Sequence, residues 1–345
     1  MISAVKSVGI LIVMITVSLL FLYFYIVATS RKMRRQQACY EKYCLHQEKN
    51  WHNYLMDGMS VAPEMLPRKT GEFLAVEYIC STYLRLVRDE EIHTRITQFA
   101  TQYLTERYKK QLQSRVWSTR MNALRYIGLF SVTSLVEPSR QLLNKKITRE
   151  ERFEVIQLLA LQDTTALLDI ICKESLQRNE YRRLFMSLSP EALVKLFQQL
   201  WSLPNEAQLL AVQVAAERRN PLFLPYVNEL LQCEESELRI GGLKIVYELG
   251  ASLPIERLAP FATATSYVER LYAVKNFNFT FLYDALPYLQ NLIGDENWYV
   301  RHEAARVLSQ SDEGVAVLKG IIENSTDTYA IDVSRQVLHR GEGVA

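Results

Sequence analysis

Glycine and proline are scarce in this sequence. Its 345 residues include only 12 Gly and 10 Pro, whereas Leu, Ala, Glu, Gln and Arg are plentiful. The abundant residues are good helix formers, and glycine and proline are the residues that most disfavour a helix interior. The composition therefore favours helices over strands. The length suffices for two conventional domains or for one elongated array.

The chain also lacks a strong net charge. The formal net charge is +2, but residues 1–35 hold five basic residues and no acidic one. The remaining chain carries 35 basic and 38 acidic residues, a formal charge of −3. A general nucleic-acid binder needs a strongly basic footprint. The near-neutral body therefore predicts that nucleic acid is not a partner.

One long hydrophobic run is present, at the N-terminus. The segment 7–28 reads SVGILIVMITVSLLFLYFYIVA, 22 residues without a charge. As a helix it would be about 33 Å long, enough to cross a hydrocarbon core of about 30 Å. We therefore expect residues 7–28 to form a transmembrane helix in the lipid bilayer.

The charges that flank this run predict its orientation. Only Lys6 and the amino terminus precede the run, whereas four basic residues follow it closely, Arg31, Lys32, Arg34 and Arg35. Basic flanks stay on the cytoplasmic side. We expect a single-pass anchor with residues 1–6 outside and everything from Arg31 onward in the cytoplasm. The alternative is a signal peptide cleaved near Ala28-Thr29-Ser30, which the length of the run and the charges after it disfavour.

The cysteines do not form a disulfide framework. Their number is odd and their spacing irregular: Cys39, Cys44, Cys80, Cys172 and Cys233. Free thiols in a reducing compartment are the simpler interpretation. Cys39 and Cys44 stand near His46 and His52, but this spacing matches no usual zinc pattern, so we expect no metal site. Cys39 is also a candidate for palmitoylation, being about ten residues from the predicted membrane helix.

A pattern repeats every 31 residues in the second half of the chain. One column holds Gln208, Arg239, Arg270 and Arg301. Three positions later every copy has a small residue: Ala211, Gly242, Ala273 and Ala304. Apolar residues follow four and seven positions after the first column, so the columns define one face of a helix. A second apolar pattern precedes this helix, and each unit is therefore predicted to be a pair of helices.

These units resemble HEAT repeats. The match is carried by Asp295 and by Val300-Arg301-x-x-Ala304-Ala305-x-x-Leu308, at the turn and second helix of one unit. It is clear over residues 205–340 and degenerate from near residue 115. The resemblance implies that residues 116–340 form an all-α solenoid of helical hairpins with a right-handed superhelix.

The rest of the chain falls into shorter segments. Residues 29–71 are expected to form a basic juxtamembrane segment and linker, with a helix over 36–56 that lacks a clean amphipathic stripe. Residues 72–115 have apolar residues at helical spacing and are expected to form a helical lead-in that caps the array. Residues 341–345 are expected to be a tail.

No catalytic residue is predicted. The sequence His302-Glu303-x-x-Arg306 lacks the second histidine that a zinc hydrolase needs, and the repeat explains its neighbours. We expect His302 and Glu303 on the exposed side of their helix. Neither a nucleophile–base pair nor a phosphate loop stands out, so no cofactor and no small-molecule ligand is evident.

Two further groups have alternative interpretations. The arginine column could bind phosphate, but Asp295 precedes Arg301 by six residues, and such pairs are structural in HEAT arrays. Aromatic residues at Phe279, Phe281 and Tyr283 follow a second helix. Packing in the core is favoured for them, and contact with a partner is the alternative.

An anchored HEAT-like surface implies a non-catalytic scaffold or adaptor that binds a protein partner at the cytoplasmic face, and the anchor favours a membrane-associated partner. The alternative within this class is an accessory subunit of a membrane enzyme, such as an envelope glycosyltransferase or secretion machinery. HEAT-like enzymes are a further alternative: a bilin lyase subunit or a DNA-alkylation-repeat glycosylase. The near-neutral body and the membrane anchor disfavour both enzymes.

Overall fold

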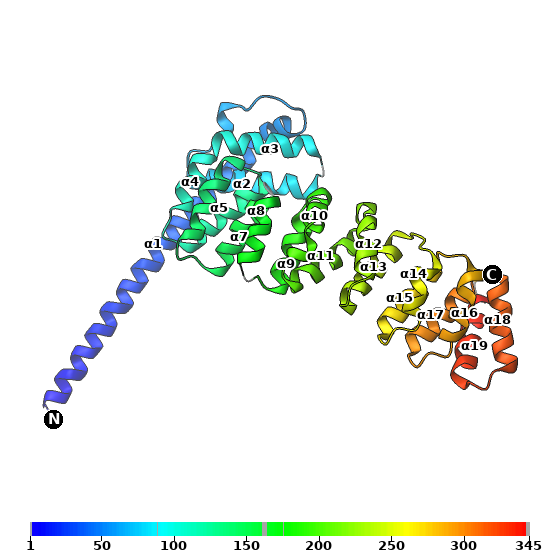
Figure 1. Ribbon diagram of the computed structural model, residues 1–345. Coiled ribbons are helices and arrows are strands. Elements are labelled where there is room, and N and C mark those ends of the chain that lie inside the picture. The colour runs from blue at the N-terminus through cyan, green and yellow to red at the C-terminus, as the bar shows by residue number, and fades with distance from the viewer. Residues whose placement is uncertain (1, 88, 161–163, 175, 343–345) are drawn as a thin grey trace. The chain divides into compact units, whose positions relative to one another are not determined.

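The computed structural model describes residues 2–87, 89–160, 164–174 and 176–342, and over these residues every regular element is a helix (Figure 1). The chain divides into two compact units, residues 1–158 and 159–345. The all-helical prediction is therefore confirmed for the described residues.

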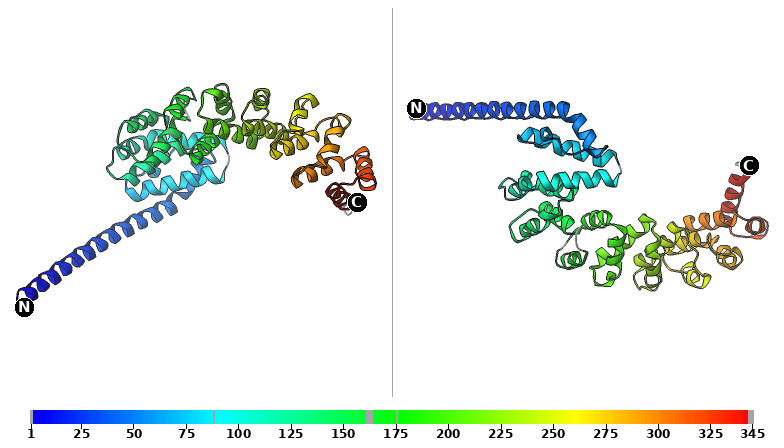
Figure 2. Two further views of the ribbon diagram at one scale, coloured as in Figure 1. Left: turned by 60° about the horizontal axis from the view of Figure 1, so that its bottom comes forward. Right: turned by 90° about the horizontal axis from the view of Figure 1, so that it is seen from above.

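The first unit is built around one very long helix. Its elements are α1 (Ile2–Leu55), η1 (Pro63–Met65), α2 (Thr70–Leu86), α3 (Glu90–Tyr103), α4 (Thr105–Leu112), α5 (Trp117–Leu129), η2 (Thr133–Leu135), α6 (Val136–Arg140), η3 (Gln141–Asn144) and most of α7 (Arg149–Ala160). The N-terminal half of α1 projects away from the other helices of its unit (Figure 2).

The apolar part of α1 is exposed from Met14 to Ile26, where its large apolar side chains are all more than half exposed. An 18-residue window of this helix has a mean hydropathy of 1.6, so α1 is long and apolar enough to cross a membrane. This is a criterion of length and composition, and a signal sequence also meets it.

The C-terminal part of α1 belongs to the core of the first unit. The helix predicted over 36–56 is present as the last part of α1, which runs unbroken to Leu55. The expected lack of a stripe is wrong, because this part of α1 buries Tyr43, Trp51 and Tyr54 on one side. The ring of Trp51 lies 4.8 Å from that of Phe99 in α3. The helix ends where Arg95 of α3 donates to the carbonyl oxygen of Leu55 at 2.5 Å. The charged residues on the other sides of α1 hid this stripe.

Gly71 allows α2 to start directly against α1. A Cβ at this position would lie 2.5 Å from the backbone oxygen of Gln36 and 2.9 Å from the Cβ of Cys39. These atoms belong to a helix backbone and its first side-chain carbon, so they cannot rotate away. Glycine is therefore required for the observed contact between α1 and α2.

Replacing Gly71 with alanine should lower the free energy of unfolding by about 1–3 kcal/mol, because the start of α2 must move away from α1. Thermal and denaturant unfolding of the full chain in detergent would measure this. Gly320→Ala is the matched control, since its Cβ would meet no atom within 4 Å, and there alanine should be neutral or stabilising. Equal effects of the two substitutions would contradict the close approach.

The second unit is a succession of shorter helices. They are α8 (Thr164–Lys173), α9 (Arg178–Ser187), α10 (Pro190–Phe197), η4 (Leu200–Ser202), α11 (Asn205–Arg218), η5 (Pro221–Tyr226), α12 (Val227–Leu231), α13 (Ser236–Leu249), α14 (Ile255–Ala262), α15 (Tyr267–Phe277), α16 (Leu282–Leu292), α17 (Trp298–Leu308), α18 (Asp312–Asn324) and α19 (Thr328–Glu342).

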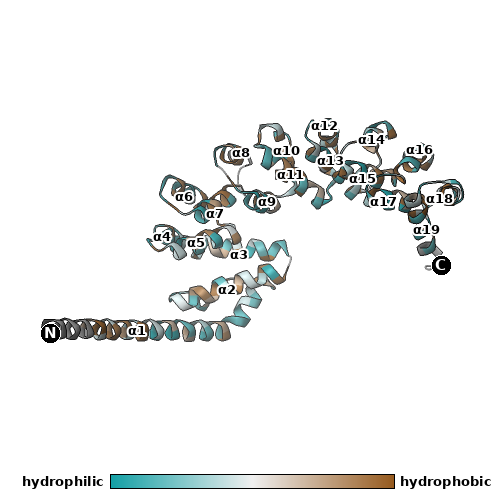
Figure 3. Cartoon of the chain, turned by 90° about the horizontal axis from the view of Figure 1, so that it is seen from below, coloured by the Kyte–Doolittle hydropathy of each residue, from teal (hydrophilic) through white to brown (hydrophobic). Residues whose placement is uncertain are grey.

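Within the second unit of the chain, the second helix of each predicted repeat contacts the second helix of the next repeat. α11, α13, α15, α17 and α19 form one layer, in which each helix packs on the next, and α12, α14, α16 and α18 pack on the helix that follows each of them (Figure 3). The small column lies at these contacts. Ala211, Ala273 and Ala304 are fully buried, and a Cβ on Gly242 would lie 3.1 Å from the Cβ of Leu230 in α12.

Candidate functional site

The arginine column closes the turns between paired helices. In α13, α15 and α17 the fourth residue is an arginine, and its Nη1 donates to the carbonyl oxygens five and six residues earlier. In Arg270 these bonds reach Ala264 at 2.8 Å and Thr265 at 2.9 Å. The guanidinium thus satisfies carbonyl groups that the turn leaves without helical partners.

Two of these arginines, Arg239 and Arg270, also reach a carboxylate of the following repeat, and Arg120 of α5 does the same with Glu151 of α7. The Nε atom lies 2.6 Å from the acceptor in each of the three pairs, Arg120–Glu151, Arg239–Glu269 and Arg270–Asp295. All three carboxylates are buried, with side-chain exposures of 0–6%. Charge-assisted bonds of this kind are strong when desolvated and well aligned. Each of these three arginines therefore ties its own turn to the next helical pair.

The partner of Asp295 differs from the predicted one. Its carboxylate accepts from Nε and Nη2 of Arg270, in the preceding unit, while Arg301 binds only its backbone oxygen at 2.6 Å. The sequence pairs Asp295 with Arg301 by their six-residue spacing. The fold instead brings Arg270 to it, because α15 packs beside α17.

The series of arginine–carboxylate pairs, which we call the arginine ladder, does not continue at Arg301. Among the described residues, no carboxylate lies within ion-pair distance of its guanidinium, which instead lies 5.0 Å from the ring centroid of Tyr329. Its Nε is buried and has no hydrogen-bond partner in the described part of the chain. At this last position a cation–π contact between Arg301 and Tyr329 replaces the ion pair.

A row of exposed aromatic side chains runs along the start of these helices. Tyr267, Trp298 and Tyr329 are 31 residues apart and are 44, 48 and 67% exposed. Tyr299 lies beside Trp298, at a centroid distance of 5.2 Å. Because α15, α17 and α19 pack in sequence, the four side chains occupy one edge of the second unit. We call them the aromatic row. The sequence reasoning missed them, although Tyr267 and Trp298 stand three residues before Arg270 and Arg301 in the repeat.

The three aromatic residues singled out from the sequence lie elsewhere. Phe281 and Tyr283 are 85 and 87% exposed, so the preference for core packing is wrong for both. They lie at the start of α16, at the opposite end of the α16–α17 hairpin from Trp298. The residues that α16 buries are Ala285, Leu289 and Leu292, on another side of the helix. Phe279 is half-buried, and its ring packs at 6.0 Å from that of Tyr247.

His302 and Glu303 do not lie free on an exposed face, so that expectation is wrong. The imidazole of His302 stacks on Trp298 with centroids 4.9 Å apart. Glu303 forms a two-bond ion pair with Arg306, and its side chain is largely buried. Within the described residues, no three His, Cys, Asp or Glu side chains gather in a group that could hold a metal ion.

No known family model matches this chain, and no curated protein matches it. Among solved structures, it is similar to a crystal structure of an engineered protein from the Northeast Structural Genomics Consortium. The two chains are 14% identical, the match covers 78% of this chain and 96% of the other, and the TM-score is 0.25. A similarity at this level supports no inference about fold or function.

A polar hollow of about 530 Å³ lies at the other end of the second helices. Its basic side chains are already engaged: Arg219 pairs with Glu248 at 2.6 Å, Arg306 pairs with Glu303, and Lys275 lies over the ring of Tyr247. Binding of nucleic acid would require a basic groove with unpaired cations. This hollow does not have that character. The aromatic row is the stronger candidate for contact with another molecule.

A second buried acid of the first unit, besides Glu151, is Glu77. Glu77 of α2 is 3% exposed, and the nearest cation is Arg107 at 3.8 Å. Burial raises the pKa of Glu77 to about 7, and the charge of Arg107 only partly opposes this. Tyr108 and Cys80 are buried beside it. Glu77 lines none of four surface hollows formed by the described residues, and its neighbours are buried, so we interpret it as a determinant of stability.

Proposed function

We propose that this protein is a membrane-tethered, non-catalytic scaffold that binds a protein partner through a HEAT-like α-solenoid. The 31-residue period, the packed layer of second helices and the arginine ladder support this proposal. Repeated units of this kind present extended surfaces, because each unit buries its apolar face against its neighbours.

The aromatic row is the observation that carries the proposal. Exposed tyrosine and tryptophan side chains are enriched in the energetic centres of protein interfaces. Their helices are held in register by the Arg270–Asp295 pair and by the buried small residues. A rigid edge loses little conformational entropy when it binds a partner. The four side chains therefore form a preorganised apolar edge.

The tether is proposed from α1. Its large apolar side chains from Met14 to Ile26 are exposed, and a lipid core would cover them. The basic residues Arg31, Lys32, Arg34 and Arg35 support an orientation with the folded units on the cytoplasmic side. Holding the scaffold at the membrane raises its effective concentration for membrane-associated partners, including membrane enzymes.

Capture of crosslinked partners from the native cell tests this function. Replacing Trp298 and Tyr329 with serine should reduce recovery of the partner about tenfold or more, because hot-spot residues each contribute 1–2 kcal/mol or more. Phe281→Ser/Tyr283→Ser is the control, because it removes two aromatic residues that are more exposed than Trp298 and Tyr329 and lie at the other end of a hairpin. If no protein is lost selectively with the first pair, the aromatic row is not the binding edge.

A further inference from the structure

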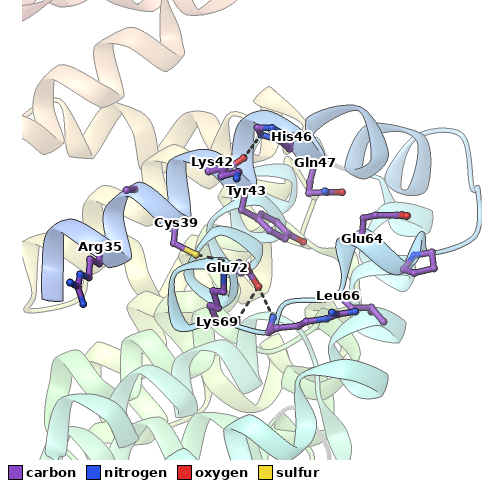
Figure 4. A pocket seen from close by; sticks show the side chains of 13 residues that line it. Arg35, Cys39, Lys42, Tyr43, His46, Gln47, Glu64, Leu66, Lys69 and Glu72 are labelled. Carbon is purple, nitrogen blue, oxygen red and sulfur yellow. Dashed lines mark hydrogen bonds between the residues drawn. The ribbon is translucent and has the colours of Figure 1, made fainter.

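A basic pocket lies between α1 and the start of α2. It encloses about 750 Å³, and a second hollow of about 500 Å³ adjoins it, sharing Arg35, Cys39 and Lys69 in its lining. Figure 4 shows Arg35 at one end and Glu64 at the other, with Lys69 and Glu72 between α1 and the loop. The second hollow extends from Arg35 back to Ala28, the last residue of the apolar segment.

The cations come to the pocket from two separate parts of the sequence. Arg35 lies about one helical turn after Arg31, and Lys42 lies about three turns after Arg31. The three side chains therefore share one side of α1. Arg68 and Lys69 face them from the residues that precede α2. Arg34 belongs to the same basic run but lines neither hollow.

The walls of the pocket are fixed by packing. The close approach at Gly71 sets the start of α2 against α1. The hydroxyl of Tyr43 donates to the backbone oxygen of Met65 and accepts from the indole of Trp51 at 3.2 Å. The segment that carries Arg68 and Lys69 is thus held to α1 at both ends, and the site is formed before any ligand binds.

The positive charge around the two hollows is only partly offset within the protein: Glu64 and Glu72 also line the larger hollow, and the charge of Lys69 contributes to lowering the pKa of Glu72. Across the described residues, none of the six cations around the two hollows has a carboxylate within 4 Å or a side-chain hydrogen bond; they are Arg31, Lys32, Arg35, Lys42, Arg68 and Lys69. Glu72 accepts instead from the backbone N–H groups of Arg68 at 2.7 Å and Lys69 at 3.0 Å. Although burial opposes it, these bonds lower the pKa of Glu72.

The height of these cations matches one class of ligand. Arg31 and Arg35 lie about 4.5 and 10.5 Å beyond Ala28 along a helix that rises about 1.5 Å per residue. The headgroup region of a bilayer extends roughly 5–8 Å beyond each side of the hydrocarbon core. The hollow begins at Ala28, and Arg31 therefore lies within the headgroup region. The backbone of Arg35 lies about 3 Å beyond that region, a distance that its long side chain can span to reach a lipid phosphate.

We propose that this pocket binds the headgroup of an anionic phospholipid, with the phosphate between Arg35 and Lys69. The inference rests on the proposed membrane tether. Arginine and lysine donate charge-assisted hydrogen bonds to phosphate oxygens, and the larger hollow beyond Arg35 has room for the polar part of the headgroup. A zwitterionic lipid would bring its own cation into a site that already has excess positive charge.

The test is titration of the full chain in detergent with dioctanoyl phosphatidylglycerol, with bound lipid counted by native mass spectrometry. We expect saturable binding of one lipid, and weaker binding of dioctanoyl phosphatidylcholine and of glycerol 3-phosphate. Arg35→Gln and Lys69→Gln should each weaken binding about fivefold. Arg34→Gln is the matched control, since it removes the same charge from the same basic run outside the pocket, and it should change binding less than twofold.

Three results would overturn the proposal. Equal weakening by Arg34→Gln and Arg35→Gln, with none by Lys69→Gln, would mean diffuse attraction and no pocket. Equal affinity for phosphatidylcholine would mean that the headgroup charge is not recognised. Equal affinity for glycerol 3-phosphate would mean a site for soluble phosphates.

Failure of the tether is a separate result. Extraction of the full chain from native membranes by alkaline carbonate would refute the tether, whatever the lipid titration gives. Conversely, an Arg35→Gln/Lys69→Gln variant that stays in the membrane and still recovers the partner, but binds no phosphatidylglycerol, would support the lipid site and leave the scaffold proposal intact.

Discussion

Replacing Asp295 with alanine should lower the free energy of unfolding by about 3–5 kcal/mol. The carboxylate accepts two bonds from Arg270, at 2.6 and 3.0 Å, and one from the N–H of Asn297 at 2.8 Å. Its side chain is only 6% exposed, so the substitution leaves the Arg270 guanidinium without its desolvated partner. Denaturant unfolding of the full chain, followed by tryptophan fluorescence, would measure the loss.

Glu296 provides the control, because it pairs with the same guanidinium at 3.1 Å but is 84% exposed. Glu296→Ala should cost less than about 1 kcal/mol. The double variant Arg270→Met/Asp295→Leu should recover only part of the loss, since it removes both charges together but also the bonds that Arg270 donates to the carbonyl oxygens of Ala264 and Thr265. Similar, small effects of Asp295→Ala and Glu296→Ala would show that burial of the pair does not determine its contribution.

Stability should fall as the pH rises through 7, because of Glu77. Burial raises the folded-state pKa of this carboxyl to about 7, above the unfolded value of about 4.3. The corresponding stabilisation is complete below the unfolded pKa and is lost as the pH rises through the folded pKa. A difference of this size corresponds to about 4 kcal/mol. Thermal unfolding in detergent between pH 5 and 8 would reveal the decline.

Glu77→Gln should flatten this dependence and be more stable than the natural chain at pH 8, since no charge then forms in the buried site. Glu48→Gln is the control, because Glu48 is an exposed carboxylate on α1 of the same unit. A natural chain whose unfolding temperature is unchanged between pH 6 and 8 would contradict the raised pKa of Glu77.

The helical pairs could be predicted because packing constrains their sequence directly. Ala211, Ala273 and Ala304 must be small where neighbouring helices meet, so the period is visible without a structure. The partner of Asp295 could not be predicted, since it lies 25 residues earlier and reaches it only through the packing of α15 on α17. Short spacing favoured Arg301 instead.

Surface features were harder to predict, for a related reason. The columns of small and apolar residues identify the buried side of the repeat. Tyr267, Trp298 and Tyr329 recur at the same spacing but are exposed, so the pattern of burial does not reveal them. The basic pocket joins Arg35 to Lys69, and only the close approach at Gly71 brings them together. A linker was expected where those two parts of the chain meet.

The continuity of α1 makes the first folded unit a rigid extension of the segment that precedes it. No flexible joint separates Ala28 from Trp51, so an axial turn at one end is transmitted to the other. Each residue of a helix contributes about 100° of rotation and 1.5 Å of length. One residue inserted after Ser30 would therefore swing Tyr43 and Trp51, together with the helices packed on them, by more than a quarter of a circle about the helix axis. Seven inserted residues would nearly restore the original rotation about the helix axis and would move the unit by about 10 Å along that axis. The number of residues in this helix thus determines both the distance of the unit from the apolar segment and its rotation about the helix axis.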